Sequence, residues 1–435
     1  MPKTVLLFFF LLLASSAVAQ NTLDIQIIDG RESAIPITIV PFAWESAGFP
    51  DSTDMAEVIS NDLTRSGQFR GSPRSDIFDR PSRGSDLNFA TYRQLKQDYV
   101  VVGRIQDGPD NTYRVEFELH SVLKQEEMLA LALSGQPGDL RATAHQISDL
   151  IYEKILGVRG AFFTRIAYIT AKRQTTNPEY AIWVADSDGF NPQRIVWNSQ
   201  PFISPTWSPD GRYLAYVTFE HGGQSIYMHE VSTGSRRRLT SFKGINGAPA
   251  FSPDGRQMAM ALSKDGDPDI YVMDIASGRL TQLTNHYAID TEPAWMPNGQ
   301  EILFTSDRAG KPQIYRVAVN GGSASRVTSV GDYNTRANVS FDGRKIAMVQ
   351  GGNNVYRIAV LDRQRSDTGT VRVITSGPLD ESPSFAPNAS MVLYAAREGN
   401  RGVLYAASAD GLVKQKLTFG EGDVREPAWG PFRPR

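Results

Sequence analysis

The sequence predicts an α/β N-terminal domain followed by an all-β six-bladed β-propeller that the C-terminal strand closes. The first observation is the motif Pro-Ala-Phe-Ser-Pro-Asp-Gly at residues 249–255, which has six copies, some looser, spaced 44, 44, 44, 46 and 44 residues apart. The second is that four strand types follow one another in the same order within each repeat, as in a propeller blade. The third is that helical periodicity is present before Gly160 and absent at useful length after it.

The motif itself indicates where each copy lies in its blade. The other five copies begin at Pro205, Pro293, Ala337, Pro383 and Pro427. Because proline cannot donate a hydrogen bond to a strand ladder, we expect this strand to be the innermost one, facing the central channel. The Pro-Asp-Gly that follows forms a tight turn, so the aspartates of these turns have a structural explanation rather than a catalytic one.

The strand count at the two ends predicts how the ring closes. The first repeat starts at residues 166–169 and lacks the innermost strand, whereas the chain ends on a surplus copy at residues 427–429. We therefore expect the last strand to complete the first blade and to remove two open sheet edges. Deletion of residues 425–435 should then unfold the protein or make it aggregate.

Length and composition limit the classes of protein that are compatible with the chain. Its 435 residues, 41% of them hydrophobic, suffice for two or three domains with full cores. A formal net charge of −2 gives no general basic signal for nucleic acid or for an anionic membrane. The chain contains no cysteine, which excludes thiol catalysis and disulfide bonds.

The first nineteen residues have the pattern of a secretory signal peptide. Lys3 is followed by an apolar run over residues 5–13 and by a small-residue cleavage site at 17–19. We expect signal peptide 1–19, a mature chain from Gln20 and export of the protein; the alternative to a signal peptide is a buried N-terminal strand or a membrane anchor. No other stretch approaches the roughly 20 apolar residues of a membrane span, so we expect no direct membrane insertion.

Residues 20–158 are expected to form the N-terminal domain, and residues 159–435 the propeller. Alternation over residues 20–35 predicts a short strand or an extended arm, with a disordered terminus as the alternative. The remaining pattern predicts strands at 37–42, 99–105, 113–119 and 128–133, a loop at 70–88, and helices at 55–66 and 140–156, the second ending at Gly157.

Motifs for catalysis and metal binding are missing from the sequence. It has no G-x-S-x-G, no H-E-x-x-H and no phosphate-binding loop, and its five histidines show no ligand spacing. Residues 186–191 are rich in oxygen ligands, but without the final glutamate of a calcium loop they are better explained as a hairpin turn. We expect no cofactor and no metal site, although a propeller channel lined by acidic or carbonyl groups could hold a cation.

The loops that lead into the innermost strands all open on one face. Apolar residues among small polar ones mark their tips, at Phe202, Ile245, Ile289, Tyr333 and Leu379. An apolar centre with a polar surround is the composition of a protein-binding site. The alternative is that these side chains pack back into the blades.

Several segments of the chain match one known family: residues 160–168 at the domain junction, the motif region 246–255, and 262–264, 271–274, 304–307 and 427–429. With these segments in this order, essentially the whole chain resembles the TolB family of the Tol-Pal system of Gram-negative bacteria. The resemblance implies a non-enzymatic periplasmic adaptor that binds the lipoprotein Pal of the outer membrane and TolA of the inner membrane. Such proteins support outer-membrane integrity and its invagination during cell division, and some colicins use the system for import.

Carried onto this chain, the resemblance places Pal contacts at Ile245, Ala248 and Thr291, and the family has histidine at the position of Ile245. With the neighbouring loop residues, the predicted Pal-binding face consists of Phe202, Ser204, Ile245, Asn246, Ala248, Asp290, Thr291, Glu292, Tyr333, Arg336, Glu381 and Arg425. The predicted TolA-binding arm consists of Leu23, Asp24, Ile25, Gln26, Ile27, Ile28, Asp29 and Gly30. We expect a monomer.

An exported propeller hydrolase is the alternative function. A lactonase-like enzyme would need a metal and acidic ligands that converge in the central channel, and a peptidase-associated module would need a catalytic domain, for which no residues remain after Pro431. For the adaptor, an arm at residues 20–30 that either docks on the body or is free suggests that Pal binding could control access of TolA.

Overall fold

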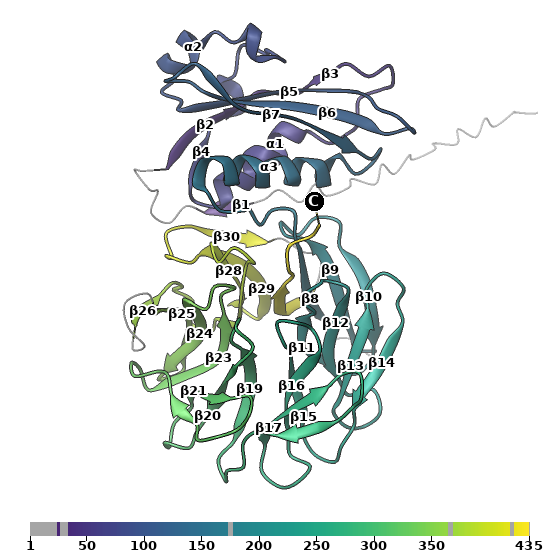
Figure 1. Cartoon of the computed structure of the whole chain (residues 1–435), viewed down its shortest axis with the longest axis vertical. Coiled ribbons are helices and arrows are strands. Elements are labelled where there is room, and N and C mark those ends of the chain that lie inside the picture. The colour runs from purple at the N-terminus through teal and green to yellow at the C-terminus, as the bar shows by residue number, and fades with distance from the viewer. Residues whose placement is uncertain (1–23, 27–33, 173–176, 364–368, 418–421, 435) are drawn as a thin grey trace, which may run out of the picture.

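The computed structural model describes residues 24–26, 34–172, 177–363, 369–417 and 422–434 (Figure 1). Two domains lie one above the other in this view, and the chain's C-terminal strand ends close to their junction. Among the described residues, none of the helices has both the length and the apolar character needed to cross a membrane. The predicted signal peptide lies outside the described residues.

The N-terminal domain is a mixed sheet with its two long helices on one face. Strand order is β4-β2-β5-β6-β7, with β3 also paired to β5; β2 pairs in parallel with β4 and β5, and β5, β6 and β7 form an antiparallel meander. The strands are β2 (Ile35–Ile39), β3 (Ala43–Trp44), β4 (Phe69–Gly71), β5 (Tyr99–Asp107), β6 (Tyr113–Ser121) and β7 (Glu126–Gly135). The helices are α1 (Met55–Arg65), α2 (Phe89–Gln94) and α3 (Leu140–Leu156), with short 3-10 turns at Arg74–Asp76 and Gly84–Asp86.

Helices α1 and α3 separate the sheet from the propeller (Figure 1). Their apolar faces bury residues such as Ile59, Leu63 and Ile147 against β2, β5 and β6. The Asp54 side chain caps α1 by accepting a hydrogen bond from the backbone N–H of Glu57 at 3.2 Å. Helix α3 ends at Gly157, as the sequence predicted, and Gly157 takes the left-handed conformation with φ of 74°.

The propeller has six antiparallel four-stranded blades. Blade 1 contains β31 (Asp423–Trp429), β8 (Arg165–Lys172), β9 (Glu179–Asp186) and β10 (Gln193–Asn198). Blade 2 contains β11 (Phe202–Trp207), β12 (Tyr213–Thr218), β13 (Ser225–Glu230) and β14 (Arg236–Thr240). Blade 3 contains β15 (Asn246–Phe251), β16 (Gln257–Leu262), β17 (Asp269–Asp274) and β18 (Leu280–Gln282).

The other three blades have the same order of strands. Blade 4 contains β19 (Asp290–Trp295), β20 (Glu301–Ser306), β21 (Gln313–Ala318) and β22 (Ser325–Arg326). Blade 5 contains β23 (Tyr333–Val339), β24 (Lys345–Gly352), β25 (Val355–Asp362) and β26 (Thr370–Val373). Blade 6 contains β27 (Glu381–Phe385), β28 (Met391–Glu398), β29 (Arg401–Ser408) and β30 (Lys414–Leu417).

The predicted closure of the ring is confirmed. The last strand, β31, pairs antiparallel with β8, the first strand of the propeller, and Trp429 lies opposite Ile166 in the register. The motif strand is the innermost strand in all six blades, as its prolines predicted. The aspartates of the turns are structural: Asp254, for example, accepts hydrogen bonds from the Ser252 hydroxyl and the Arg256 backbone N–H.

Part of the N-terminal arm belongs to the propeller's sheet. Strand β1 (Asp24–Gln26) pairs antiparallel with β30 and so forms a fifth strand on blade 6, with Ile25 opposite Gln415. The predicted arm residues Leu23, Ile27, Ile28, Asp29 and Gly30 lie outside the described residues.

Candidate functional site on the loop face of the propeller

Each innermost strand breaks register at the same place, just after the loop that leads into it. In every blade the break coincides with a non-glycine residue at positive φ, between +47° and +55°: Ser204, Ala248, Glu292, Arg336, Ser382 and Glu426. Such backbone is costly unless its surroundings impose it. The six side chains line the central channel, a cavity of about 570 Å³, and form a ring at its loop-side mouth.

Ion pairs tie this ring together. The Arg336 guanidinium contacts Glu292 Oε1 at 3.0 Å and Glu426 Oε1 at 3.2 Å, and it also donates to the Ser382 hydroxyl. The Glu426 carboxylate accepts a hydrogen bond from the backbone N–H of Ser204 at 3.3 Å. The network therefore joins blades 4, 5, 6, 1 and 2. The carboxylate of Glu426 foremost, with that of Glu292, raises the pKa of Arg336, which keeps this side chain positively charged.

The apolar tips of the loops divide into exposed and packed residues. Ile245 and Ile289 are exposed, at 39% and 51%, whereas Phe202 is buried edge-on against Tyr216. Tyr333 and Leu379 are half-buried. Packing back into a blade is therefore observed for Phe202, whereas the role of the exposed tips in protein binding stays a prediction. Sequence reasoning passed over three further exposed apolar residues on the same loops: Phe242, Tyr287 and Val330.

Buried Asx residues hold the loops in shape. Asn246, Asp290, Asn334 and Asp380 occupy matching positions in blades 3 to 6, and all are buried. Asn246 accepts from the Phe242 backbone N–H at 2.9 Å, and Asn334 donates to the Val330 carbonyl at 3.0 Å. The predicted face residues Phe202, Asn246 and Asp290 therefore lie beneath the surface, where they shape the loops, and their role as partner contacts stays a prediction.

The remaining predicted face residues lie around the ring. Thr291, Glu381 and Arg425 are half-buried. Arg425 pairs with Asp423 at 2.8 Å. The structure thus gathers the predicted residues on one face, with a charged ring at the channel mouth and apolar tips exposed around it.

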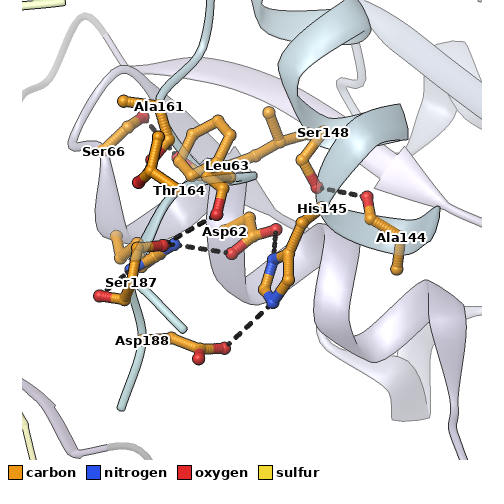
Figure 2. A network of polar contacts seen from close by, with 12 residues as sticks. Asp62, Leu63, Ser66, Ala144, His145, Ser148, Ala161, Thr164, Ser187 and Asp188 are labelled. Carbon is orange, nitrogen blue, oxygen red and sulfur yellow. Dashed lines mark hydrogen bonds and ion pairs between the residues drawn. The ribbon is translucent and has the colours of Figure 1, made fainter. Parts of the chain in front are cut away.

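A second polar cluster lies where the N-terminal domain meets the propeller (Figure 2). His145 on α3 places its Nδ1 atom 2.6 Å from Asp62 Oδ2 on α1, and its Nε2 atom 3.5 Å from Asp188 Oδ2 in the β9–β10 turn. Arg65 pairs with Asp62 at 3.0 Å and donates to the Ser187 hydroxyl at 2.8 Å, and Arg141 pairs with Asp188. These contacts join α1 and α3 to the β9–β10 turn of blade 1.

The electrostatics of this cluster favour charged partners in spite of burial. Burial lowers the pKa of His145, but the carboxylates of Asp62 and Asp188 outweigh burial and hold the pKa above its ordinary value. Burial raises the pKa of Asp188, but His145, Arg65 and Arg141 outweigh it and bring the pKa to about 2. His145 and Asp188 therefore form an ion pair across the domain boundary.

Two clusters of the described residues bring possible metal ligands together: Asp62, His145 and Asp188, and Glu118, His120 and Glu127. In the first cluster, two arginine guanidinium groups already neutralise the carboxylates, so an ion-pair network fits it better than a cation site. In the second, Arg104 lies 3.7 Å from Glu118 and weakens the case for a cation in the same way.

Fold and site together define a class: a two-domain protein with an α/β domain and a six-bladed propeller, whose loop face has a charged ring at the channel mouth and exposed apolar residues around it. Known proteins of this class match the chain. A model of the TolB amino-terminal domain matches residues 23–128, and a model of the TolB beta propeller domain matches residues 152–433. The Tol-Pal system protein TolB of Xanthomonas campestris pv. campestris is 60% identical over 424 residues, which cover 97% of this chain and 96% of that protein.

Two further comparisons agree. The Tol-Pal system protein TolB of Xanthomonas euvesicatoria pv. vesicatoria is 61% identical over 97% of this chain and 96% of that protein. The crystal structure of TolB from Acinetobacter baumannii is 38% identical, covers 94% of this chain and 100% of that one, and superposes with a TM-score of 0.86. The chain therefore belongs to the TolB family, and the family and fold class expected from the sequence are confirmed. It is a component of the periplasmic Tol-Pal system.

Proposed function

We propose that this Tol-Pal system protein is a non-enzymatic adaptor that binds the lipoprotein Pal through the loop face and TolA through the N-terminal arm. In that role it would link the outer and inner membranes and support outer-membrane integrity and invagination during cell division. The observation that carries the proposal is the ring of exposed apolar residues, among them Ile245, Tyr287 and Ile289, around a rigid charged mouth. Rigid apolar anchors with a polar surround are what a protein partner needs.

The channel chemistry supports binding over hydrolysis. A lactonase-like site needs acidic ligands that converge in the channel and are free to hold a metal. The two glutamates at the mouth both form ion pairs with the Arg336 guanidinium, at 3.0 Å for Glu292 Oε1 and 3.2 Å for Glu426 Oε1. The Arg336 guanidinium therefore compensates the negative charge that a bound metal ion would need.

Binding to Pal can be tested with the mature chain and the periplasmic part of Pal by calorimetry. Ile289→Asp places a charge on an exposed tip of the loop face and should weaken Pal binding by at least about tenfold, which corresponds to about 1.4 kcal/mol. Phe341→Asp is the matched control, because Phe341 is similarly exposed, at 56% against 51% for Ile289, but lies at the other end of the channel. Absence of Pal binding by the unchanged protein, or equal losses in both variants, would overturn the proposal.

For the arm, the supporting observation is that its described residues form a strand on the outer edge of blade 6. The three described residues of the arm, Asp24–Gln26, pair with β30, and blade 6 has its four strands β27, β28, β29 and β30 without them. Release of this strand would therefore leave the four-stranded sheet of blade 6 intact. We propose that Pal binding shifts the arm between docked and free states and so controls TolA access.

If Pal binding regulates TolA access in this way, the binding of Pal and the binding of TolA are thermodynamically coupled. The affinity for TolA, measured with and without saturating Pal, should differ, and Pal affinity should change by the same factor when TolA is present. Equal TolA affinity with and without Pal would rule out this regulation, but it would not contradict the proposal that the chain binds Pal and TolA separately.

A further inference from the structure

A small cavity beside the central channel has two arginines in its wall. Its volume is about 90 Å³, and it lies between the start of β8, the motif turn of blade 2 and the C-terminal tail, with Arg165, Gly211 and Arg433 among its lining residues. Gly430 and Pro431 line both this cavity and the channel, so the cavity adjoins the end of the channel opposite the loop face.

The two guanidinium groups lack a paired carboxylate. Among the described residues, neither of them forms an ion pair with an acidic side chain, and Arg165 donates one hydrogen bond, from Nη2 to the Gly211 carbonyl at 3.1 Å. The charge of Asp186 acts on both from a distance, but that carboxylate already accepts a hydrogen bond from Asn191 at 2.7 Å. Burial lowers the pKa of Arg165, and the positive charge of Arg433 lowers this pKa further, so the two cations repel each other.

Aromatic rings hold both guanidinium groups in place. The Cζ atom of Arg433 lies 4.0 Å from the centre of the Phe163 ring, and that of Arg165 lies 5.1 Å from the centre of the Trp207 ring. Stacking covers a face of each guanidinium and leaves the N–H donors, which lie in its plane, available to a ligand. Forks of this kind match the oxygen atoms of phosphate and carboxylate groups.

We propose that this cavity binds one oxyanion group, and phosphate in preference to carboxylate, between Arg165 and Arg433. A water molecule needs only roughly 10–15 Å³ of such space, so the cavity has room for a group of this size. Asp210 also lines the cavity, but its Oδ1 atom accepts from the Ser208 hydroxyl and the Arg212 backbone N–H of its own turn. Two positive charges against one negative charge favour a phosphate group, which carries about 1.5 to 2 negative charges near pH 7.

A bound oxyanion joins three distant parts of the chain. Arg165 begins the propeller, Gly211 belongs to blade 2, and Arg433 follows the closing strand β31. The Arg433 carbonyl also accepts a hydrogen bond from Arg159 Nη2 at 2.7 Å, which attaches the tail to the segment between the domains. The ligand therefore removes the repulsion between the two cations and stabilises the closed ring. The loop face and the arm contribute no residue to this cavity, so the proposal is independent of Pal and TolA binding.

Isothermal titration calorimetry of the mature chain with inorganic phosphate tests the proposal, in a buffer without other oxyanions and at constant ionic strength. The unchanged protein should bind one phosphate per chain. Arg433→Gln should weaken this binding by at least about tenfold, because it removes one of the two charged donors. Arg194→Gln is the matched control: the Arg194 guanidinium also stacks on an aromatic ring, 4.1 Å from the centre of Trp197, but it is already paired with Glu179.

Two further ligands define the chemistry of the site. Acetate should bind more weakly than phosphate, because it carries a single charge. Glycerol 3-phosphate distinguishes the sources of the phosphate group: binding as tight as that of phosphate assigns the site to a phosphate ester, and exclusion assigns it to the free anion. Thermal melting without phosphate checks that both variants are folded. Absence of phosphate binding by the unchanged protein, equal affinity in Arg433→Gln, or tighter binding of acetate would overturn the proposal.

Discussion

Trp429 is the side chain on which closure of the propeller most depends. It is 8% exposed on β31, its indole N–H donates to the Thr164 hydroxyl at 2.9 Å, and its backbone N–H donates to Ser384 Oγ at 2.9 Å. In the core of blades 6 and 1 it packs with Ile166 and neighbouring apolar residues. Trp429→Ala removes this side chain from the strand that joins the two ends of the ring and leaves a cavity there.

Truncation of a buried tryptophan to alanine costs about 3–5 kcal/mol of the free energy of unfolding. For a unit of this size we expect the melting temperature to fall by about 10 °C. Differential scanning calorimetry should follow the propeller transition, because the two domains need not melt together. Trp197→Ala is the matched control: Trp197 is 53% exposed on β10, so its loss should change stability by less than about 1 kcal/mol. An unchanged melting temperature for Trp429→Ala, or an equal fall in both variants, would refute the closure argument.

Two further predictions concern charge. The raised pKa of His145 means that its protonated form stabilises the fold fully below the ordinary pKa of 6.5, and that this stabilisation is lost as pH rises through the raised pKa. Urea denaturation should therefore show the free energy of unfolding falling with pH in that range, and His145→Gln should abolish the fall. An unaltered pH dependence in the variant would show that another group causes it. Arg336→Ala leaves two glutamates unpaired at the channel mouth and should lower the free energy of unfolding by about 1–2 kcal/mol, since the Arg336 side chain is one-third exposed. Arg344→Ala breaks only an exposed pair and should lower it by less than about 0.5 kcal/mol. Chemical denaturation measures both values, and equal losses of stability would contradict the role of the ring.

The propeller could be predicted in detail because its information is repeated. Each blade presents the same apolar strand and turn, so an error in one copy is corrected by the other five, and the unequal count at the ends fixes the closure. The elements that were missed in the N-terminal domain have no such support. Helix α2 has six residues and β4 has three, and both are too short to show a period.

The loop face was predictable in position but not in detail. Ile289 and Leu379 occupy matching places in their loops, yet Ile289 is exposed and Leu379 is half-buried. The exposure of each tip depends on its packing against other parts of the chain, which the local sequence pattern does not reveal. The interdomain network was not predictable for a related reason: Asp62, His145 and Asp188 lie on three elements separated by up to 126 positions along the chain, and only folding brings them together.

Strands β31 and β1 are both attached to the propeller by antiparallel strand pairing, but they differ in length. Both add to an open blade edge by antiparallel pairing, but β31 has seven residues and buries Trp429, whereas β1 has three. Each backbone hydrogen bond contributes a net stabilisation of only about 0.5–1.5 kcal/mol, so the pairing of β1 by itself contributes a few kcal/mol at most. A partner that offers the arm a longer or better-packed edge can therefore displace it. Displacement of β31 costs far more free energy, because its removal exposes the core of two blades.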